Sequence, residues 1–219
     1  MKSKKAIIFD LDGVIVDTAK YHFIAWQKIA GELEIEFTKK DNELLKGVSR
    51  VKSLDIILDL GGKNISKPEK DSLLTQKNEH YLQLISNMNE DELLPGIKQL
   101  LTDLHKNNIP FALGSASKNA RRILDALQLT DKFTAIVDGT DVSKAKPNPE
   151  VFLIAAKKLH YPPEKCIVIE DAKAGIAAAN AVNMLSVGIG DTQNLYDADL
   201  VLEDTSKLNY RLIKGLITE

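Results

Sequence analysis

The sequence predicts a doubly wound α/β protein with a mainly parallel sheet and an inserted bundle of helices. From Pro95 onward, helical and strand patterns alternate with short connections, which is typical of a parallel sheet covered by helices. Between residues 17 and 93, by contrast, only helix-period patterns occur. We therefore predict an α/β core domain made of residues 1–16 and 94–219, and a helical cap domain made of residues 17–93.

The first predicted strand, Ala6–Phe9, is apolar without alternation, which suits a strand buried on both faces of a parallel sheet. Asp10 and Asp12 follow it, separated by Leu11. Because side chains alternate along an extended chain, both carboxylates can face one pocket while Leu11 turns back to the core. Gly13 then permits a sharp turn. The alternative is an ordinary turn in which the aspartates only accept hydrogen bonds from nearby amides.

The inserted segment carries apolar residues at helical spacing, which would pack as a small bundle. The expected stripes are Phe23, Trp26, Ala30 and Leu33; then Leu54, Ile57 and Leu58; then Leu73, Leu74, Tyr81, Leu84 and Ile85. The segment would join the core through linkers near residues 15–17 and 87–94. Two adjacent linkers make a natural hinge.

The remaining core elements are expected to alternate along the chain. They are helix 96–106, strand 110–114, helix 118–129, strand 135–137, helix 150–159, strand 166–169, helix 172–181, strand 185–189 and strand 200–202. Polar residues follow these strands: Ser115 the second, Lys146 the third, and Glu170 with Asp171 the fourth. Since the carboxyl ends of parallel strands meet at one edge of a sheet, these residues are expected to join Asp10 at a single site.

The chemistry of these residues is mutually consistent. Several carboxylates at one site repel one another unless a cation lies among them, and oxygen ligands suit Mg²⁺. A hydroxyl and a lysine beside them would bind a phosphoryl group. Taken singly, Ser115 could cap a helix, Lys146 could be an ordinary loop residue, and the two acids could complement a helix N-terminus. Their joint occurrence at successive strand ends favours a phosphate site.

Composition excludes several other classes of protein. With 219 residues and a net charge of -2, the chain has no global attraction for nucleic acid or an anionic membrane, so neither is an expected partner. The single cysteine, Cys166, excludes a disulfide framework or a Cys-rich metal site. No segment is long enough to span a bilayer, and no signal-peptide core follows the basic start. We expect a cytoplasmic protein.

The motifs at residues 10–14, 115, 146–147, 170–171 and 174–176 together resemble the signature motifs of the haloacid dehalogenase superfamily, whose members have a Rossmann-like core sheet. The resemblance spans the whole chain, with the helical insert after the first strand. Within the superfamily, the segments 17–23, 46–50 and 115–119 are similar to those of the β-phosphoglucomutase family.

The resemblance implies a two-step phosphoryl transfer. Asp10 would be the nucleophile that forms an aspartyl-phosphate, and Asp12 would be the general acid and base. Ser115 and Lys146 would hold the transferring oxygens. The implied reaction interconverts β-D-glucose 1-phosphate and glucose 6-phosphate, with β-glucose 1,6-bisphosphate as the priming intermediate. The implied cofactor is Mg²⁺, and its expected ligands are Asp10, the main-chain carbonyl of Asp12, Asp171 and, in or near the shell, Glu170.

The cap would supply discrimination between a sugar and water. By resemblance, His22 and Lys77 belong to a relay that switches Asp12 into its working position; otherwise they are a structural histidine and a lysine that reaches solvent. A mutase also needs a grip on a second, non-reacting phosphate, for which the planar guanidinium of Arg50 is suited. The expected substrate-binding residues are Thr18, His22, Lys46, Gly47, Val48, Arg50, Lys77, Ala116, Ser117, Lys118 and Asn119.

Two other functions fit parts of the pattern. A phosphatase would use the same core with water as acceptor, acting on a sugar phosphate or phosphoglycolate. A phosphoacceptor module would share the open sheet and acidic pocket, but it requires neither a large cap nor a second carboxylate at Asp12. The expected partners are therefore small sugar phosphates, and because the catalytic pocket is self-contained, a monomer is expected to suffice.

Overall fold

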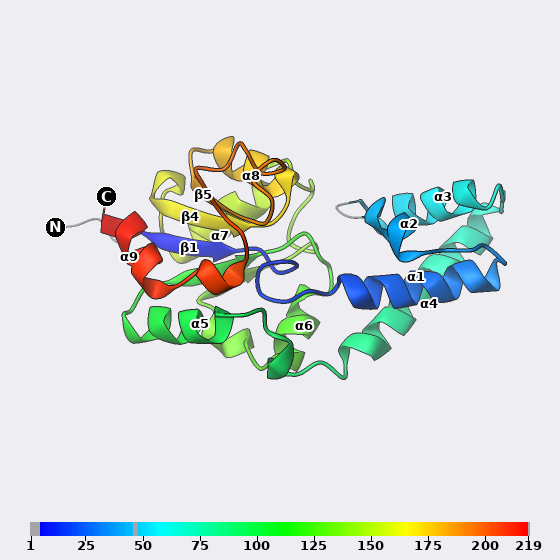
Figure 1. The fold of residues 1–219 in the computed structure, drawn as a ribbon, viewed down its shortest axis with the longest axis horizontal. Coiled ribbons are helices and arrows are strands. Elements are labelled where there is room, and N and C mark those ends of the chain that lie inside the picture. The colour runs from blue at the N-terminus through cyan, green and yellow to red at the C-terminus, as the bar shows by residue number, and fades with distance from the viewer. Residues whose placement is uncertain (1–4, 46–47, 219) are drawn as a thin grey trace. The chain divides into compact units, whose positions relative to one another are not determined.

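The computed structural model of the chain describes residues 5–45 and 48–218. The chain forms two compact units (Figure 1). One consists of Met1–Asp17 together with Met88–Glu219, and the other of Thr18–Asn87. In the described part of the chain, no helix has both the length and the apolar character needed to cross a membrane.

The core unit contains a six-stranded sheet in the order β3-β2-β1-β4-β5-β6, and each neighbouring pair is parallel. The strands are β1 (Ala6–Phe9), β2 (Phe111–Gly114), β3 (Ala135–Val137), β4 (Cys166–Glu170), β5 (Leu185–Ile189) and β6 (Leu200–Leu202). In the register of the sheet, Phe9 lies between Leu113 and Ile169. The carboxyl end of the central strand is therefore flanked by the ends of β2 and β4.

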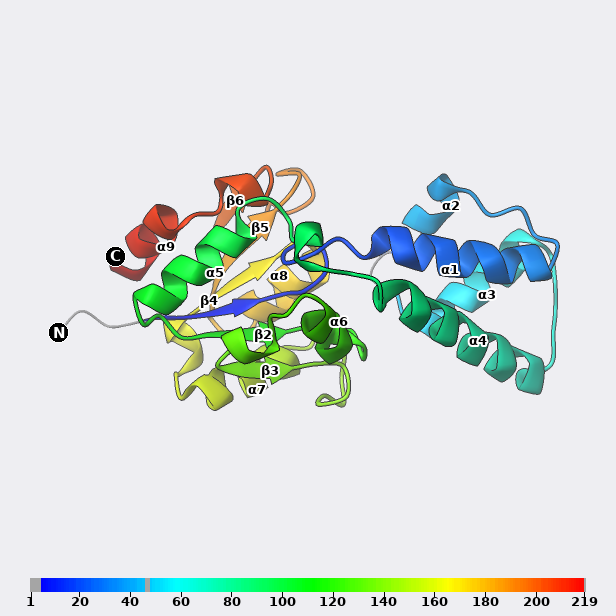
Figure 2. The ribbon, with the colours of Figure 1, turned by 90° about the horizontal axis from the view of Figure 1, so that it is seen from below.

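Helices cover both faces of this sheet. They are α5 (Ile97–Lys106), α6 (Ala120–Ala126), α7 (Glu150–Leu159), α8 (Lys173–Asn180) and α9 (Tyr210–Thr218), with short 3-10 turns at Glu90–Glu92, Thr130–Lys132, Pro163–Lys165 and Thr205–Lys207. Helices α7 and α8 lie on one face, and α5, α6 and α9 on the other (Figures 1 and 2). The predicted doubly wound α/β fold is confirmed.

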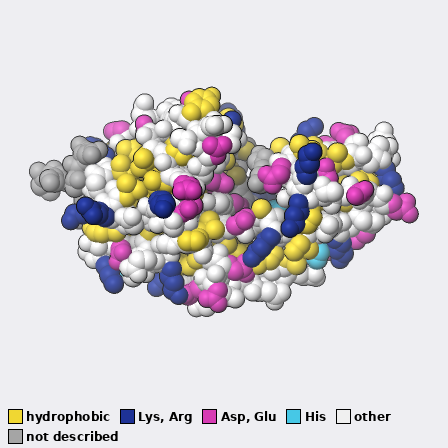
Figure 3. Space-filling view, in the orientation of Figure 1, with side chains coloured by type: hydrophobic (Ala, Val, Ile, Leu, Met, Phe, Trp, Pro, Cys, Tyr) yellow, Lys and Arg dark blue, Asp and Glu magenta, His cyan; other side chains and the backbone are white. Residues whose placement is uncertain are grey.

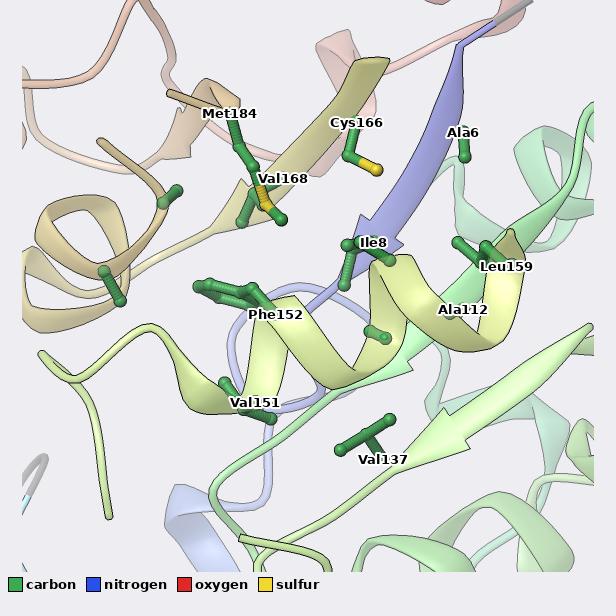
Figure 4. Packing of buried hydrophobic residues seen from close by; sticks show 14 residues of the cluster. Ala6, Ile8, Ala112, Val137, Val151, Phe152, Leu159, Cys166, Val168 and Met184 are labelled. Atoms are coloured by element: carbon green, nitrogen blue, oxygen red, sulfur yellow. The ribbon is translucent and has the colours of Figure 1, made fainter. Parts of the chain in front are cut away.

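The core on the α7 side joins the central strands to the helices. Figure 4 shows Ile8 and Val168 of the sheet facing Phe152 of α7, with Met184 beside them. Cys166 is 1% exposed in the same cluster. Its burial, and to a lesser extent the negative charge of Glu164, raises the pKa of its thiol to about 11. The cysteine is therefore an inert part of the core.

In the second unit, every regular element among the described residues is a helix. Its helices are α1 (Ala19–Glu32), α2 (Lys39–Glu43), α3 (Arg50–Leu60) and α4 (Lys67–Ile85). Helices α1 and α4 lie side by side in both views (Figures 1 and 2). Thr38 and Ser66 begin α2 and α4 with capping boxes, which satisfy amides that the first turn leaves free.

The boundary after the insert differs from the sequence expectation. Residues 88–93 were expected in the cap, but they lie in the core unit. Leu93 pairs with Val16 in an antiparallel bridge, and the amide of Leu94 donates to the carbonyl of Ile15 over 3.0 Å. These backbone bonds attach the returning chain to the segment that leaves β1.

The start of α6 also differs. The apolar pattern predicted a helix from residue 118, with Ser117 to Asn119 at its beginning, but α6 starts at Ala120. The amide of Ser117 donates to Ser115 Oγ over 3.1 Å, and the amide of Asn119 donates to Ser117 Oγ over 3.2 Å. Serine hydroxyls that bind nearby amides compete with helix formation, so this segment is a turn before the helix.

Candidate active site

The acidic loop after β1 is tightly closed. The amide of Asp10 donates to the carbonyl of Ile169 over 2.9 Å, which extends the sheet by one residue, and Leu11 is fully buried as predicted. The amide of Gly13 donates to the carbonyl of Val16 over 2.8 Å. Gly13 has a φ of +75°, a conformation that strongly favours glycine. The loop thus turns back immediately after the two aspartates.

Lys146 connects the acids at the ends of β1 and β4. Its Nζ lies 2.5 Å from Asp10 Oδ1 and 2.8 Å from Glu170 Oε2, and the side chain is only 9% exposed. Burial alone would lower the pKa of this ammonium, but the two carboxylates raise it above its ordinary value. Lys146 is therefore a permanent cation beside the Asp10 carboxylate.

Asp10, Glu170 and Asp171 form the carboxylate cluster of this edge. One carboxylate oxygen from each lies within 4.8 Å of the others. Although Asp171 is partly open to solvent, desolvation by the surrounding protein atoms, followed by the charges of Asp10, Glu170 and Asp12, raises the pKa of its carboxyl group to about 8. The electrostatic cost of ionising Asp171 here would be offset by a divalent cation, and a set of oxygen donors fits a hard ion. The residues present therefore fit the expected metal.

Glycines make room for this cluster. A Cβ on Gly13 would lie 2.1 Å from Asp171 Oδ2, and a Cβ on Gly175 would lie 1.9 Å from Glu170 Oε2. Glu170 also accepts a hydrogen bond from the amide of Ala172 over 3.1 Å. The glycines of both motifs thus let the backbone approach the acids closely.

Ser115 follows β2 and is 1% exposed. Its amide donates to the carbonyl of Val137 over 3.0 Å, and its hydroxyl accepts the amide of Ser117. Because an accepting hydroxyl keeps its own proton, Ser115 can still donate to a phosphate oxygen, and the same holds for Ser117. Ala116 and Lys118 are exposed, and Asn119 is half-buried.

Within the helical unit, the buried Lys77 pairs with the half-buried His22. Lys77 is 2% exposed, and its Nζ lies 2.8 Å from His22 Nδ1. The ammonium also lies 4.9 Å from the ring centroid of Trp26 and 4.7 Å from that of Tyr81, distances at which aromatic faces attract a cation. The alternative in which Lys77 reaches solvent is therefore wrong.

Burial and neighbouring positive charges lower the pKa of both Lys77 and His22. Burial, followed by the cation of Arg50, lowers the pKa of Lys77 to about 7. Burial, followed by Lys77 and Arg50, lowers the pKa of His22 to about 3. His22 is thus neutral near neutral pH, and its ring stacks on Tyr81 with centroids 4.3 Å apart.

The other predicted cap residues have different environments. Thr18 is 1% exposed, whereas Val48 is 39% exposed. Arg50 is half-buried at the start of α3. Lys46 and Gly47 lie outside the described residues. The structure thus brings Asp10, Glu170 and Asp171 together near Lys146, and separately brings His22 together with Lys77.

Sequence reasoning missed one buried acid at this sheet edge. Asp138 directly follows β3 and is 1% exposed. The available signal was a carboxylate placed immediately after a short apolar strand, the same signal that identified Asp10.

Comparison with known proteins gives a consistent result. A protein-family model described as haloacid dehalogenase-like hydrolase matches residues 4–183. The β-phosphoglucomutase of Bacillus subtilis is 48% identical over 211 residues, covering 95% of this chain and 93% of that protein. The phosphorylated carbohydrates phosphatase of Thermotoga maritima is 29% identical over 204 residues, covering 91% and 90%.

Solved structures agree with this grouping. A crystal structure of β-phosphoglucomutase from Clostridium difficile superposes with a TM-score of 0.88 at 47% identity, covering 97% of this chain and 96% of that one. The matched residues 4–183 include the acids of β1 and β4, Ser115 and Lys146. The chain belongs to the haloacid dehalogenase-like hydrolase family, and within that family it groups with the β-phosphoglucomutases.

Proposed function

We propose that this enzyme is a phosphomutase that interconverts β-D-glucose 1-phosphate and glucose 6-phosphate, with β-glucose 1,6-bisphosphate as the intermediate. The observation that carries the proposal is the pairing of Asp10 with Lys146 at the sheet edge, in a chain 48% identical to a β-phosphoglucomutase. We also propose that it acts as a monomer in the cytoplasm on small sugar phosphates. Positive and negative side chains intermingle on the face drawn in Figure 3, which supports small substrates over polyanions.

Asp10 and Asp12 divide the chemistry of each half-reaction. A carboxylate oxygen of Asp10 forms a bond to phosphorus as the bond from phosphorus to the sugar oxygen breaks. Asp12 donates a proton to that leaving oxygen. In the reverse direction Asp12 removes the proton of the attacking sugar hydroxyl, and the bond from phosphorus to Asp10 breaks. Lys146 supports this chemistry because its positive charge lies beside the attacking carboxylate.

The transferring oxygens need donors and positive charge. The hydroxyl of Ser115 would donate a hydrogen bond to one of these oxygens. Lys146 would neutralise their negative charge as the phosphoryl group moves. Asp10, the carbonyl of Asp12 and Asp171 would hold Mg²⁺, with Glu170 in or near its shell. When bound, the ion supplies positive charge that offsets the carboxylates and the phosphoryl oxygens.

Selection of a sugar would come from the remaining predicted residues. We propose that Arg50, Ser117, Lys118 and Asn119 hold the non-reacting phosphate. Lys46, Gly47 and Val48 would shape the sugar pocket, as the motif resemblance implies. The pair of Lys77 and His22 would form the relay that switches Asp12 into its working position, and Thr18 would contact the substrate. The unusual environment of Lys77 supports a function beyond packing.

A coupled assay tests the proposal. β-Glucose 1-phosphate, Mg²⁺ and a trace of β-glucose 1,6-bisphosphate are supplied, and glucose 6-phosphate and inorganic phosphate are measured in parallel. We expect glucose 6-phosphate to form in large excess over phosphate. Steady release of phosphate without glucose 6-phosphate would establish the second candidate, a sugar-phosphate phosphatase, which the 29% identity to a carbohydrate phosphatase favours.

A further inference from the structure

Asp138 is a buried carboxylate that the proposed chemistry does not use. Its Oδ1 accepts the amide of Thr140 over 2.8 Å and the hydroxyl of Thr140 over 2.6 Å, and its Oδ2 lies 3.0 Å from Arg121 Nε. Burying a charge is costly unless it is paired and hydrogen-bonded, and Asp138 satisfies both conditions. Its bonds therefore fix the loop after β3 and attach that loop to Arg121.

Arg121 connects this loop to the start of α6. Its Nη2 lies 2.8 Å from Asp141 Oδ2 and donates to the carbonyl of Ile136 over 3.1 Å. A guanidinium that binds through several nitrogens fixes orientation as well as distance, because its donors form a rigid plane. Arg121 lies two residues after Asn119. The bridge thus anchors the chain immediately beyond the turn at 117–119.

Gly139 holds the same turn from its other side. Its amide donates to the carbonyl of Ser117 over 3.1 Å. A Cβ at this position would lie 2.3 Å from the carbonyl oxygen of Ala116 and 3.0 Å from the amide nitrogen of Lys118. These neighbours are backbone atoms, so no side-chain rotation could relieve the contact. The loop after β3 and the turn therefore pack backbone against backbone.

We propose that Arg121, Asp138 and Gly139, here called the clamp, are positioning residues that hold Ser117–Asn119 in the conformation that grips the non-reacting phosphate of the bisphosphate. The proposal rests on the mutase function proposed above. The contacts of the clamp reach the turn at 116–119 and the loop after β3, whereas Lys146 and the acids after β1 and at the end of β4 form a different cluster. Loosening the clamp should therefore weaken the hold on the second phosphate and spare transfer of a single phosphoryl group to Asp10.

The test compares two arginines that are adjacent in the sequence. Arg121→Ala removes the bridge to Asp138, whereas Arg122→Ala removes the same charge from an exposed position of α6 that contributes to none of these bonds. Two quantities are measured: the concentration of β-glucose 1,6-bisphosphate that gives half-maximal mutase turnover, and kcat/KM for hydrolysis of p-nitrophenyl phosphate, which has no second phosphate.

For Arg121→Ala we expect the half-maximal bisphosphate concentration to rise about five- to tenfold, while kcat and p-nitrophenyl phosphate hydrolysis stay within about twofold of wild type. Arg122→Ala should leave both quantities near wild type. Asp138→Asn should change them in the same direction as Arg121→Ala. If that variant fails to fold, Arg121→Ala still decides the question, since its side chain is 46% exposed.

Two results would overturn the clamp: an unchanged bisphosphate requirement in Arg121→Ala, or an equal loss of both activities, which would indicate a structural role only. Failure of the mutase function is recognised separately, because the wild-type enzyme would then form no glucose 6-phosphate. In that case calorimetric binding of β-glucose 1,6-bisphosphate decides the clamp, and equal affinities of wild type and Arg121→Ala would contradict it.

Discussion

Lys146 Nζ lies 2.5 Å from Asp10 Oδ1 and, on its other side, 2.8 Å from Glu170 Oε2, so one buried cation serves two carboxylates. Removing one partner of a buried ion pair is far more damaging than the net strength of the pair suggests, because the remaining charges lose their compensation. In this enzyme those remaining charges are the proposed nucleophile and an acid of the metal cluster.

Lys146→Ala should therefore lower both activity and stability. We expect kcat to fall by roughly a hundred- to a thousandfold, as for loss of one electrostatic contact in a transition state. The free energy of unfolding should fall by about 3–5 kcal/mol. Urea titration and the coupled assay measure the two effects. A variant as stable as the wild type would show that the ion pairs are not coupled to folding.

Gly175→Ala tests the space around Glu170. Alanine is a better helix former than glycine by about 1 kcal/mol, so propensity alone predicts stabilisation. A Cβ here, however, would lie 1.9 Å from Glu170 Oε2. We expect the carboxylate to be displaced, with loss of stability by thermal unfolding and of turnover.

Gly31→Ala is the matched control for this substitution. Gly31 is also helical, in α1, and a Cβ there would meet no atom within 4 Å. It should gain about 0.5–1 kcal/mol of stability at unchanged activity. Equal gains from both substitutions would mean that the close approach of α8 to Glu170 is unimportant.

The strands and their polar ends were predictable from sequence because an unbroken apolar run ending in an acid or a serine is a local pattern. Strands 6–9, 135–137, 185–189 and 200–202 have the predicted bounds. The start of α6 could not be predicted from apolar spacing, because the decisive bonds are made by the hydroxyls of Ser115 and Ser117.

Long-range pairing explains the other differences. The bridge between Val16 and Leu93 joins residues distant in sequence, so the end of the insert was misplaced. The burial of Asp138 depends on Arg121 from another element, and neither residue alone carries that information. The resemblance placed His22 and Lys77 in one relay, but their direct contact could not be predicted, since helical spacing cannot say which stripes face each other.

Lys77 should make stability depend on pH. Burial and Arg50 lower its pKa in the folded state to about 7, whereas an unfolded lysine titrates near 10.4. Between these values the unfolded state binds more protons, so the free energy of unfolding should rise as pH increases from about 7 to about 10. The cost of burying the ammonium is fully present below pH 7.

Lys77→Met removes this dependence. Urea unfolding of both proteins across that pH range should show a wild-type curve that gains a few kcal/mol relative to the variant. His22, Arg50 and Tyr81 also face Lys77, and all three are retained in the variant. Parallel curves would indicate that Lys77 titrates normally.

Removal of divalent metal should abolish turnover and addition of Mg²⁺ should restore it. Asp171→Asn removes one carboxylate from the cluster, so we expect the Mg²⁺ concentration for half-maximal activity to rise by roughly ten- to a hundredfold. The measurement is a titration of the initial rate with Mg²⁺ at a fixed substrate concentration. An unaltered Mg²⁺ requirement would remove Asp171 from the ligand set.

The most direct test of this account is whether Asp10 accepts a phosphoryl group. Wild-type enzyme is mixed with β-glucose 1,6-bisphosphate and Mg²⁺, quenched in acid within one turnover and analysed by intact-protein and peptide mass spectrometry. We predict one added phosphoryl group, on the peptide that contains Asp10, and its absence from Asp10→Asn, which should also lack mutase turnover. Full turnover by Asp10→Asn, or a phosphoryl group on another residue, would contradict the assignment of Asp10 as nucleophile.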